Sequence, residues 1–265
     1  MHSRRSYSPW RLLLAAPRSG AENMARDTAL QVRAARTGET VFSIYSWSRP
    51  TLSFGRNQPA TGLYDLAKIR SAGLDVVRRP TGGRAILHHR EVTYSVTAPV
   101  KDALPLRETY SQINRILQTG LSHLGVMTEP VPRSPATRPP SARSCFEMPA
   151  EGELVAAGCK LVGSAQWRDE RALLQHGSIL VNDDQSQLTV FAAGAQKGGA
   201  LIPAPATLHA ILGRSPSTEE VASAMFDAVR SLQDADASKL AEDEVRDETL
   251  EHVPHFLDED WTWRR

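Results

Sequence analysis

Cysteine is scarce in this sequence. Its 265 residues include only two cysteines, Cys145 and Cys159. Two cysteines are too few for a disulfide scaffold and are typical of a chain kept in a reducing compartment. The sequence therefore excludes a small disulfide-rich secreted fold and leaves a free thiol available for chemistry.

Long apolar runs and an excess of one charge are missing as well. No apolar stretch approaches the ~18–20 residues of a transmembrane helix, and the run from Leu12 to Ala16 is shorter than the ~7–15-residue core of a secretory signal. Lys and Arg total 31 against 30 for Asp and Glu. No overall field would then attract nucleic acid or an acidic membrane face. We expect a cytoplasmic protein that binds neither membrane nor nucleic acid.

The sequence does contain alternating strand and helix patterns. Strand-like runs at 41–47, 74–78, 85–88, 92–97, 153–157, 160–167 and 172–181 accompany helical patterns at 21–36, 62–72 and 105–124. Beyond residue 199 the pattern is helical again, with capping-box spacing at Ser217 and Glu220. Mixed strands with segregated helices predict an α+β fold, with a central, mostly antiparallel or mixed sheet flanked by helices. We expect one large domain over residues 10–232 and a helical, acidic C-terminal tail over 233–265.

The stretch from Pro130 to Ser144 differs in composition from its surroundings. It carries five prolines among serines and arginines. Such a composition cannot pack a core and favours an extended, mobile loop. A loop of this length is usually functional or disordered.

Residues 78–95 read RRPTGGRAILHHREVTYS and form the first segment that can carry chemistry. Backbone N–H groups of a Gly-Gly bend and guanidinium donors from three arginines can surround a small volume that suits an anion or a polarised carbonyl. The glycines let the backbone approach a ligand closely. The alternative is a glycine hairpin with solvated arginines.

Residues 159–179, CKLVGSAQWRDERALLQHGSI, form the second segment. Lys160 can donate to a carbonyl or phosphate oxygen, and the small residues that follow it leave room for a narrow apolar chain. The alternative is a buried strand with a snorkelling lysine. The histidines and the two cysteines lack a recognisable zinc spacing, so we expect no metal site.

Together the two segments resemble the lipoate protein ligase and octanoyltransferase family, within the biotin and lipoate protein ligase superfamily. RRPTGGRA at 78–85, followed by Leu87 and His88, resembles the family's signature loop, and KLVGSAQ at 160–166 resembles its second signature. Further matches are Asn23-Met24-Ala25, SFGRNQ at 53–58 and QHGS at 175–178. The resemblance covers roughly residues 10–200. It implies the superfamily's mixed sheet flanked by helices, with residues 10–232 as the catalytic domain.

The resemblance also implies the site residues. Cysteine-dependent octanoyltransferases place their nucleophile in a Cys-Phe pair before the lysine strand, and Cys145-Phe146 stands there in this chain. Cys145 and Lys160 are therefore the expected catalytic residues, Lys160 first activating Cys145 and then polarising the acyl carbonyl. The expected acyl-binding residues are Arg78, Arg79, Thr81, Gly82, Gly83, Arg84, Ala85, His88, Gly163, Ser164, Ala165, His176 and Gly177.

Two reactions remain open within the family. The favoured one moves octanoyl, or lipoyl, from acyl carrier protein through a cysteine thioester to a lysine of a lipoyl domain, and needs no cofactor. The acceptor would belong to a 2-oxoacid dehydrogenase complex or be the glycine cleavage H protein, with its acidic surface meeting Arg78, Arg79 and Arg84. The alternative is a lipoate-protein ligase that uses ATP and Mg to form lipoyl-adenylate. A non-catalytic acyl-binding protein is a third reading, against which the presence of both Cys145 and Lys160 argues.

Overall fold

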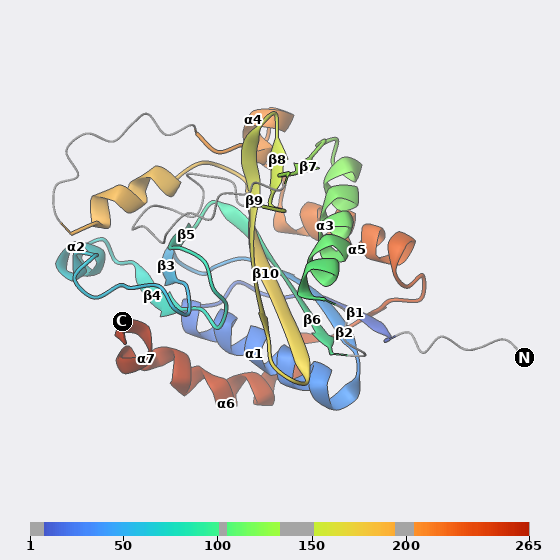
Figure 1. The fold of residues 1–265 in the computed structure, drawn as a ribbon, viewed down its shortest axis with the longest axis horizontal. Helices are drawn as coiled ribbons and strands as arrows, with labels where there is room; N and C mark the ends of the chain where they lie inside the picture. Colours follow the sequence, from blue (N-terminus) through green and yellow to red (C-terminus); the bar gives the residue numbers. More distant parts are fainter. Residues whose placement is uncertain (1–7, 101–104, 133–150, 194–203, 265) are drawn as a thin grey trace, which may run out of the picture.

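The computed structural model describes residues 8–100, 105–132, 151–193 and 204–264. Two sheets form the centre of the molecule (Figure 1). The larger sheet has eight strands in the order β11-β1-β2-β6-β10-β9-β8-β7. These strands are β1 (Trp10–Leu14), β2 (Thr40–Tyr45), β6 (Glu91–Pro99), β7 (Glu129–Pro130), β8 (Leu154–Ala156), β9 (Cys159–Arg168), β10 (Ala172–Leu180) and β11 (Ser238–Lys239). Pairing is parallel at the β11-β1-β2 edge and antiparallel elsewhere, which confirms the predicted mixed sheet.

The smaller sheet has three strands in the order β4-β3-β5. They are β3 (Thr51–Phe54), β4 (Asp75–Arg78) and β5 (Ile86–His88). Strand β3 pairs in parallel with β4 and antiparallel with β5. The chain between β4 and β5 must therefore pass over the end of β3, and this crossing is formed by residues 79–85.

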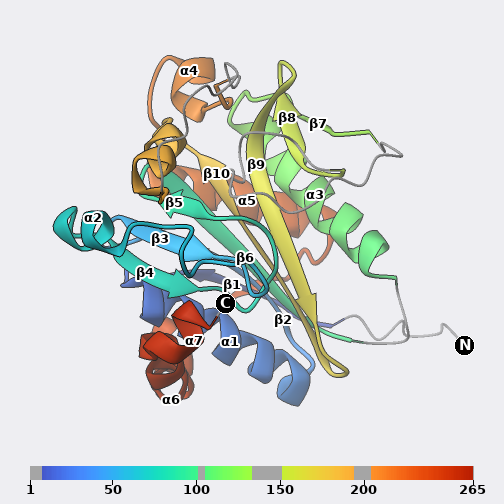
Figure 2. The ribbon, with the colours of Figure 1, turned by 60° about the vertical axis from the view of Figure 1, so that its left-hand side comes forward.

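Helices cover both faces of the large sheet, as Figure 2 shows. Helices α1 (Gly20–Thr37) and α6 (Arg246–Leu257) lie on one face, and α3 (Leu106–His123) and α5 (Thr218–Leu232) lie on the other. Ser19 and Glu22 form a capping box at the start of α1, and Ser217 and Glu220 form the predicted one at the start of α5. Shorter helices are α2 (Leu66–Ser71), η1 (Gln185–Phe191), α4 (Leu208–Leu212), η2 (Glu242–Val245) and α7 (Glu259–Trp263).

The main hydrophobic core lies between the large sheet and helices α3 and α5. The ring centroids of Phe42 and Tyr94 are 6.1 Å apart, and Phe226 of α5 meets Phe42 edge-on at 6.4 Å. Each fully buried side chain of this size stabilises the fold by about 1.5–3 kcal/mol. This core fixes β9 and β10, the strands that carry the predicted site residues Lys160, Gly163, Ser164, Ala165, His176 and Gly177.

The segment after residue 232 belongs to the same layers. Strand β11 pairs with β1, through Arg11 with Ser238, α6 packs along α1, and α7 approaches β4. The predicted helical tail thus also contains a strand that extends the large sheet.

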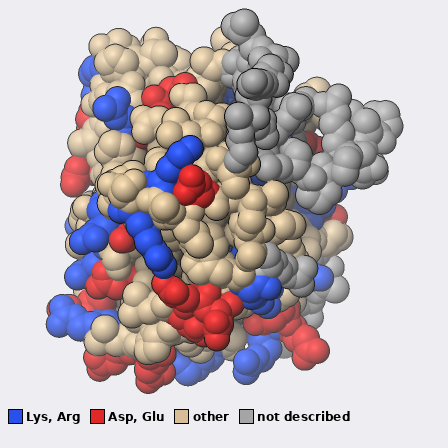
Figure 3. Space-filling model, turned by 90° about the vertical axis from the view of Figure 1, so that its left-hand side faces the viewer, with Lys and Arg blue, Asp and Glu red and all other residues tan. Residues whose placement is uncertain are grey.

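Charge on the face that carries α2 and the C-terminal helices is mixed. Figure 3 shows basic and acidic side chains interspersed there, with neither sign dominating. Within the part of the chain that the structure describes, no helix has the length and apolar character needed to cross a bilayer.

Candidate functional site

The signature bend, residues 79–85, is held against the loop that follows β3. The N–H of Arg56 donates to the carbonyl oxygen of Thr81 at 2.7 Å. A Cβ atom added to Gly55 would lie 2.0 Å from the carbonyl oxygen of Gly83. The two loops touch backbone to backbone, which only glycine at position 55 allows.

Arg78, at the end of β4, is completely buried. Its guanidinium donates to the carbonyl oxygens of Gly55 at 2.6 Å and Gln58 at 2.8 Å, and to that of Thr262 in α7 at 2.9 Å. The indole N–H of Trp261 donates back to the Arg78 carbonyl at 3.0 Å. Arg78 therefore ties the SFGRNQ loop and the C-terminal helix to the signature bend.

Arg79 is 3% exposed and braces the bend from inside. Its guanidinium donates to the carbonyl oxygens of Gly82 and Arg84 at 3.1 and 2.9 Å, and to Oγ of Ser53 at 2.5 Å. Because Arg78 and Arg79 present almost no surface, the expectation that both meet an acidic partner surface is wrong. Of the three predicted arginines, only Arg84 is partly exposed.

Thr81 is linked to helix α1 through His176. Oγ1 of Thr81 lies 2.6 Å from Nε2 of His176, and Nδ1 of His176 lies 2.7 Å from Oδ2 of Asp27. The same carboxylate accepts from the hydroxyl of Tyr45 at 2.9 Å. Burial and the charge of Asp27 hold the pKa of Tyr45 well above its ordinary value, so Tyr45 stays a donor. All four residues are buried.

His88 forms a second histidine–carboxylate pair and shares the hydroxyl of Ser53 with Arg79. Its Nδ1 lies 2.8 Å from Oε1 of Glu91, and its Nε2 lies 2.6 Å from Oγ of Ser53. Trp47 stacks on the imidazole with ring centroids 4.0 Å apart. Burial lowers the pKa of His88, and the nearby charge of Arg79 acts in the same direction. A neutral His88 that donates through Nδ1 and accepts through Nε2 satisfies both partners.

Burial would raise the pKa of Glu91, but the contact with His88 and the side-chain hydrogen bonds from His88, Ser178 and Thr93 lower it instead. Glu91 therefore stays ionised beside the neutral imidazole.

Lys160, the second residue of β9, is 2% exposed. Its Nζ lies 2.6 Å from Oε1 of Glu153, and the two side chains are 1% and 5% exposed. The predicted catalytic lysine is thus part of a buried ion pair, which the sequence did not indicate.

The small residues after Lys160 pair closely with β10. Ser164 is opposite Gly177, and a Cβ atom on Gly177 would lie 2.3 Å from the carbonyl oxygen of Gly163. The hydroxyl groups of Ser164 and Tyr94 lie 2.6 Å apart. Burial raises the pKa of Tyr94 to about 12. A Cβ atom on Gly83 would lie 4.0 Å from that of Ala165, so the signature bend reaches β9.

Only one of the two cysteines lies among the described residues. Cys145, the predicted nucleophile, lies outside the described residues, as does most of the proline-rich stretch. Cys159 is a free cysteine at the start of β9 and is partly exposed. No group of three or more potential metal ligands is found among the described residues.

Three carboxylates of this region were missed by sequence reasoning. Asp27, Glu91 and Glu153 each pair with a predicted site residue. Glu91 stands three residues after His88 and could have been found from that spacing. Asp27 reaches His176 only through the tertiary fold, whereas Glu153 reaches Lys160 across the hairpin of β8 and β9.

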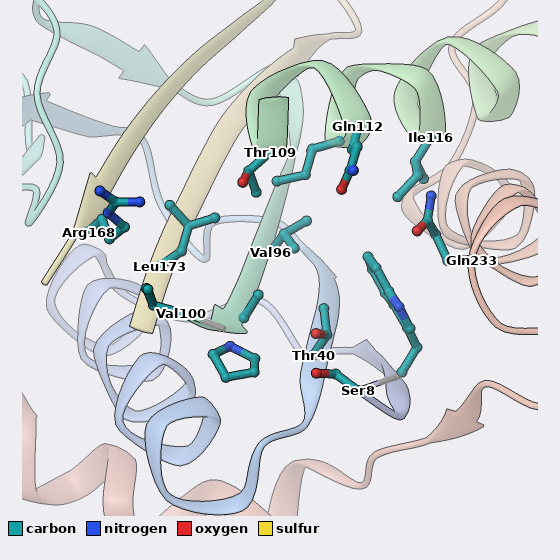
Figure 4. A pocket seen from close by; sticks show the side chains of 14 residues that line it. Ser8, Thr40, Val96, Val100, Thr109, Gln112, Ile116, Arg168, Leu173 and Gln233 are labelled. Carbon is teal, nitrogen blue, oxygen red and sulfur yellow. The ribbon is translucent and has the colours of Figure 1, made fainter. Parts of the chain in front are cut away.

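A cavity of about 330 Å³ lies between α3 and the large sheet (Figure 4). Its lining includes Val96, Ile113, Ile116 and Leu173, with Arg168 at one side, and none of the predicted site residues. Arg168 ends the strand that Lys160 nearly begins, and at ~3.3 Å per residue the two are about 26 Å apart. The cavity is separate from the signature bend.

Comparison with known proteins places these features in a family. The model of the lipoyl protein ligase A/B catalytic domain matches residues 19–230. Octanoyltransferase LipM of Carboxydothermus hydrogenoformans is 42% identical over 183 residues, which cover 68% of this chain and 67% of that protein. Octanoyltransferase LipM of Staphylococcus aureus is 38% identical over 189 residues, 68% of each chain.

Solved structures agree with the fold. A crystal structure of lipoate-protein ligase A bound with ATP superposes with a TM-score of 0.76 at 20% identity, covering 96% of this chain and 98% of that one. The bi-partite lipoate protein ligase of Thermoplasma acidophilum gives 0.74 at 19% identity and covers 97% of both chains. These likenesses confirm the predicted α+β fold.

Proposed function

Because this chain belongs to the lipoyl protein ligase A/B catalytic domain family, we propose that it is an octanoyltransferase of protein lipoylation. It takes the octanoyl group of octanoyl-acyl carrier protein and attaches it to a lysine of a lipoyl domain. The observation that carries this proposal is the 42% identity to an octanoyltransferase over two thirds of both chains. The structurally similar ligases are at most 20% identical and support the fold alone.

The reaction proceeds in two acyl transfers. The Cys145 thiol gives up its proton and the thiolate attacks the thioester carbonyl of the donor. A C–S bond to Cys145 forms, the C–S bond of the donor breaks, and the carrier leaves as a thiolate that takes up a proton. The neutral amine of the acceptor lysine then attacks the cysteine thioester. The amide C–N bond forms, the C–S bond to Cys145 breaks, and the proton lost by the amine neutralises the released thiolate. A thioester intermediate conserves the energy of the donor thioester, so the reaction requires no ATP.

The described residues supply the surroundings for this chemistry. The signature bend, braced by Arg79 and by the Thr81–His176–Asp27 contacts, presents Gly82, Gly83 and Arg84 beside Ala165 of β9. Lys160 brings a cation that can stabilise the oxyanion formed at each attack. Because Arg78 and Arg79 are buried, Arg84 is the arginine of this segment that can contact an acidic acceptor domain.

The decisive experiment is intact-protein mass spectrometry after incubation with octanoyl-acyl carrier protein in the absence of ATP. We expect an octanoyl adduct on Cys145 that passes to an added lipoyl domain. Cys145→Ser should abolish both steps, whereas the matched variant Cys159→Ser should keep them. Modification of the lipoyl domain only with lipoate and Mg-ATP would instead establish a ligase.

A further inference from the structure

Among the residues that the structure describes, Glu153 contacts the predicted catalytic lysine directly. Its Oε1 lies 2.6 Å from Nζ of Lys160, a distance typical of a short charge-assisted hydrogen bond. Both side chains are almost completely buried. A buried ion pair is weak evidence for stability, because an apolar pair of the same volume often stabilises a fold as well. Its presence at the signature lysine points to a role in the chemistry.

The backbone around Glu153 is fixed on both sides. The N–H of Val131 donates to the carbonyl oxygen of Glu153 at 2.8 Å, and the N–H of Gly152 donates to that of Val131 at 3.1 Å. Asn114 of α3 donates to the carbonyl oxygen of Gly152. Gly152 has a φ of 82°, which an L side chain rarely adopts. The carboxylate is therefore attached to a backbone that cannot easily shift.

The backbone of Lys160 is fixed as well. Lys160 pairs with Val155 of β8, and its carbonyl oxygen accepts from the N–H of Ala206 at 3.0 Å. The strand and the segment before it thus present the ammonium and the carboxylate to each other from two rigid positions. Their contact is built into the hairpin of β8 and β9.

The charge state of Lys160 follows from this contact. An ammonium that is removed from water loses its proton easily unless an opposite charge accompanies it. Glu153 supplies that charge at hydrogen-bond distance. The carboxylate also lies near Tyr94, whose pKa is raised by burial first and by the charge of Glu153 in addition.

We propose that Glu153 is a positioning residue that holds Lys160 as an ammonium and fixes the direction of its Nζ. Lys160 then acts as a donor to the acyl carbonyl oxygen in both transfers, and not as the base that takes the thiol proton. The role of Lys160 toward the acyl carbonyl rests on the proposed octanoyltransferase function. The charge assignment itself can be tested without any activity.

The test uses the small number of lysines in the full chain. There are five, Lys68, Lys101, Lys160, Lys197 and Lys239. NMR of protein labelled with ¹³C and ¹⁵N in lysine separates ammonium from neutral amine by the ¹⁵Nζ shift, and Lys160→Arg identifies the signal of interest. We expect an ammonium shift for Lys160 at pH 7.5 in the unaltered protein. A neutral-amine shift there would overturn the proposal.

Variants of Glu153 separate charge from packing. Glu153→Gln keeps the shape and removes the charge, so Lys160 should move to the neutral-amine shift at pH 7.5. Glu153→Asp keeps the charge and should keep the ammonium shift. Glu151→Gln is the matched control, because Glu151 is exposed and pairs with Arg107. If Glu153→Gln does not fold, the shifts of the unaltered protein and of Glu153→Asp decide the question.

The activity readout then tests the mechanism. We expect kcat for octanoyl transfer to fall at least tenfold in Glu153→Gln with KM for the donor little changed, a smaller loss in Glu153→Asp, and no loss in Glu151→Gln. A kcat within twofold of the unaltered protein in Glu153→Gln would overturn the positioning role. If the unaltered protein transfers no octanoyl group, the proposed function fails, while the NMR result still decides the charge of Lys160.

Discussion

Nδ1 of His176 lies 2.7 Å from Oδ2 of Asp27, although 149 residues separate the two in the sequence. The imidazole is also hydrogen-bonded to Thr81 of the signature bend, and the carboxylate also accepts a hydrogen bond from Tyr45 of β2. One buried carboxylate on α1 thus orders groups on two strands and a loop. The position of the bend therefore depends on helix α1, which lies far before it in the chain.

Replacing Asp27 tests this dependence. Asp27→Ala leaves the buried Nδ1 of His176 and the hydroxyl of Tyr45 without their acceptor, and each unpaired buried donor costs about 1–3 kcal/mol. We expect the free energy of unfolding in urea to fall by about 2–5 kcal/mol, with loss of acyl transfer. Asp227→Ala, which removes only an exposed ion pair with Arg230, should change it by less than ~1 kcal/mol. Equal losses in the two variants would contradict the assignment.

The stability of the protein should fall in mild acid because of His88. Burial keeps the pKa of His88 below 6.5 in the folded chain, so the unfolded chain binds the proton first as the pH decreases. The free energy of unfolding therefore falls as the pH drops below about 6.5. Glu91, whose pKa is lowered from 4.5, adds a loss of the same sign below about pH 4.5.

Urea unfolding at pH 7.5, 6.5 and 5.5 measures the effect of His88. The His88→Gln variant should be less stable at pH 7.5 but should show a shallower decline with pH. The same decline in both proteins would assign the pH dependence to other groups.

Two glycines at the bend should respond differently to alanine. Gly55→Ala would place a Cβ 2.0 Å from the carbonyl oxygen of Gly83, so backbone must move. We expect it to lower the free energy of unfolding by at least about 1–3 kcal/mol. Gly82 has no atom within 4 Å of an added Cβ, and Gly82→Ala should leave the melting temperature nearly unchanged. Loss of transfer in Gly82→Ala without loss of stability would locate a substrate contact there.

Arg78 should not tolerate lysine. Its guanidinium reaches carbonyl oxygens of both the SFGRNQ loop and α7, and one ammonium cannot satisfy both groups. Arg78→Lys should reduce the free energy of unfolding by about 2–4 kcal/mol, because buried carbonyl oxygens lose charged donors. Arg70→Lys, at a side chain 72% exposed, is the control and should change it by less than ~0.5 kcal/mol. A melting temperature unchanged by Arg78→Lys would show that these hydrogen bonds do not stabilise the fold.

The strands and helices that carry the site could be predicted from local patterns. The helix expected over 105–124 is α3, the strand expected over 172–181 is β10, and the capping box at Ser217 is present. These elements have strong periodicity or caps, which depend on neighbours in the sequence. The short strands β1, β3 and β11 lack such patterns and acquire their structure from pairing with distant strands.

Helix α1 buries a carboxylate that its hydrophobic pattern does not indicate. Met24 and Ala25 are buried, but Val32 is 47% exposed, whereas Asp27 is completely buried. A pattern of hydrophobic residues cannot anticipate a buried carboxylate, because its partners, His176 and Tyr45, lie on strands far along the chain. Glu153 is only seven residues before Lys160, but their contact follows from the register of the hairpin and not from a hydrophobic pattern. Lys160 was found because its motif is local.

The hydrogen bonds of Arg78 to α7 also determine when the signature bend can acquire all its contacts during synthesis. Arg78 and Thr262 are 184 residues apart, and a ribosome adding ~5–20 residues per second needs about 10–40 s to make that interval. Until then the guanidinium of Arg78 lacks the carbonyl oxygen of Thr262 as an acceptor. The carbonyl oxygen of Arg78 likewise lacks the indole N–H of Trp261 as a donor. A nascent chain that already contains the signature bend, Lys160 and Cys145 therefore remains immature. The signature bend is thus completed by a segment that is made 184 residues after Arg78.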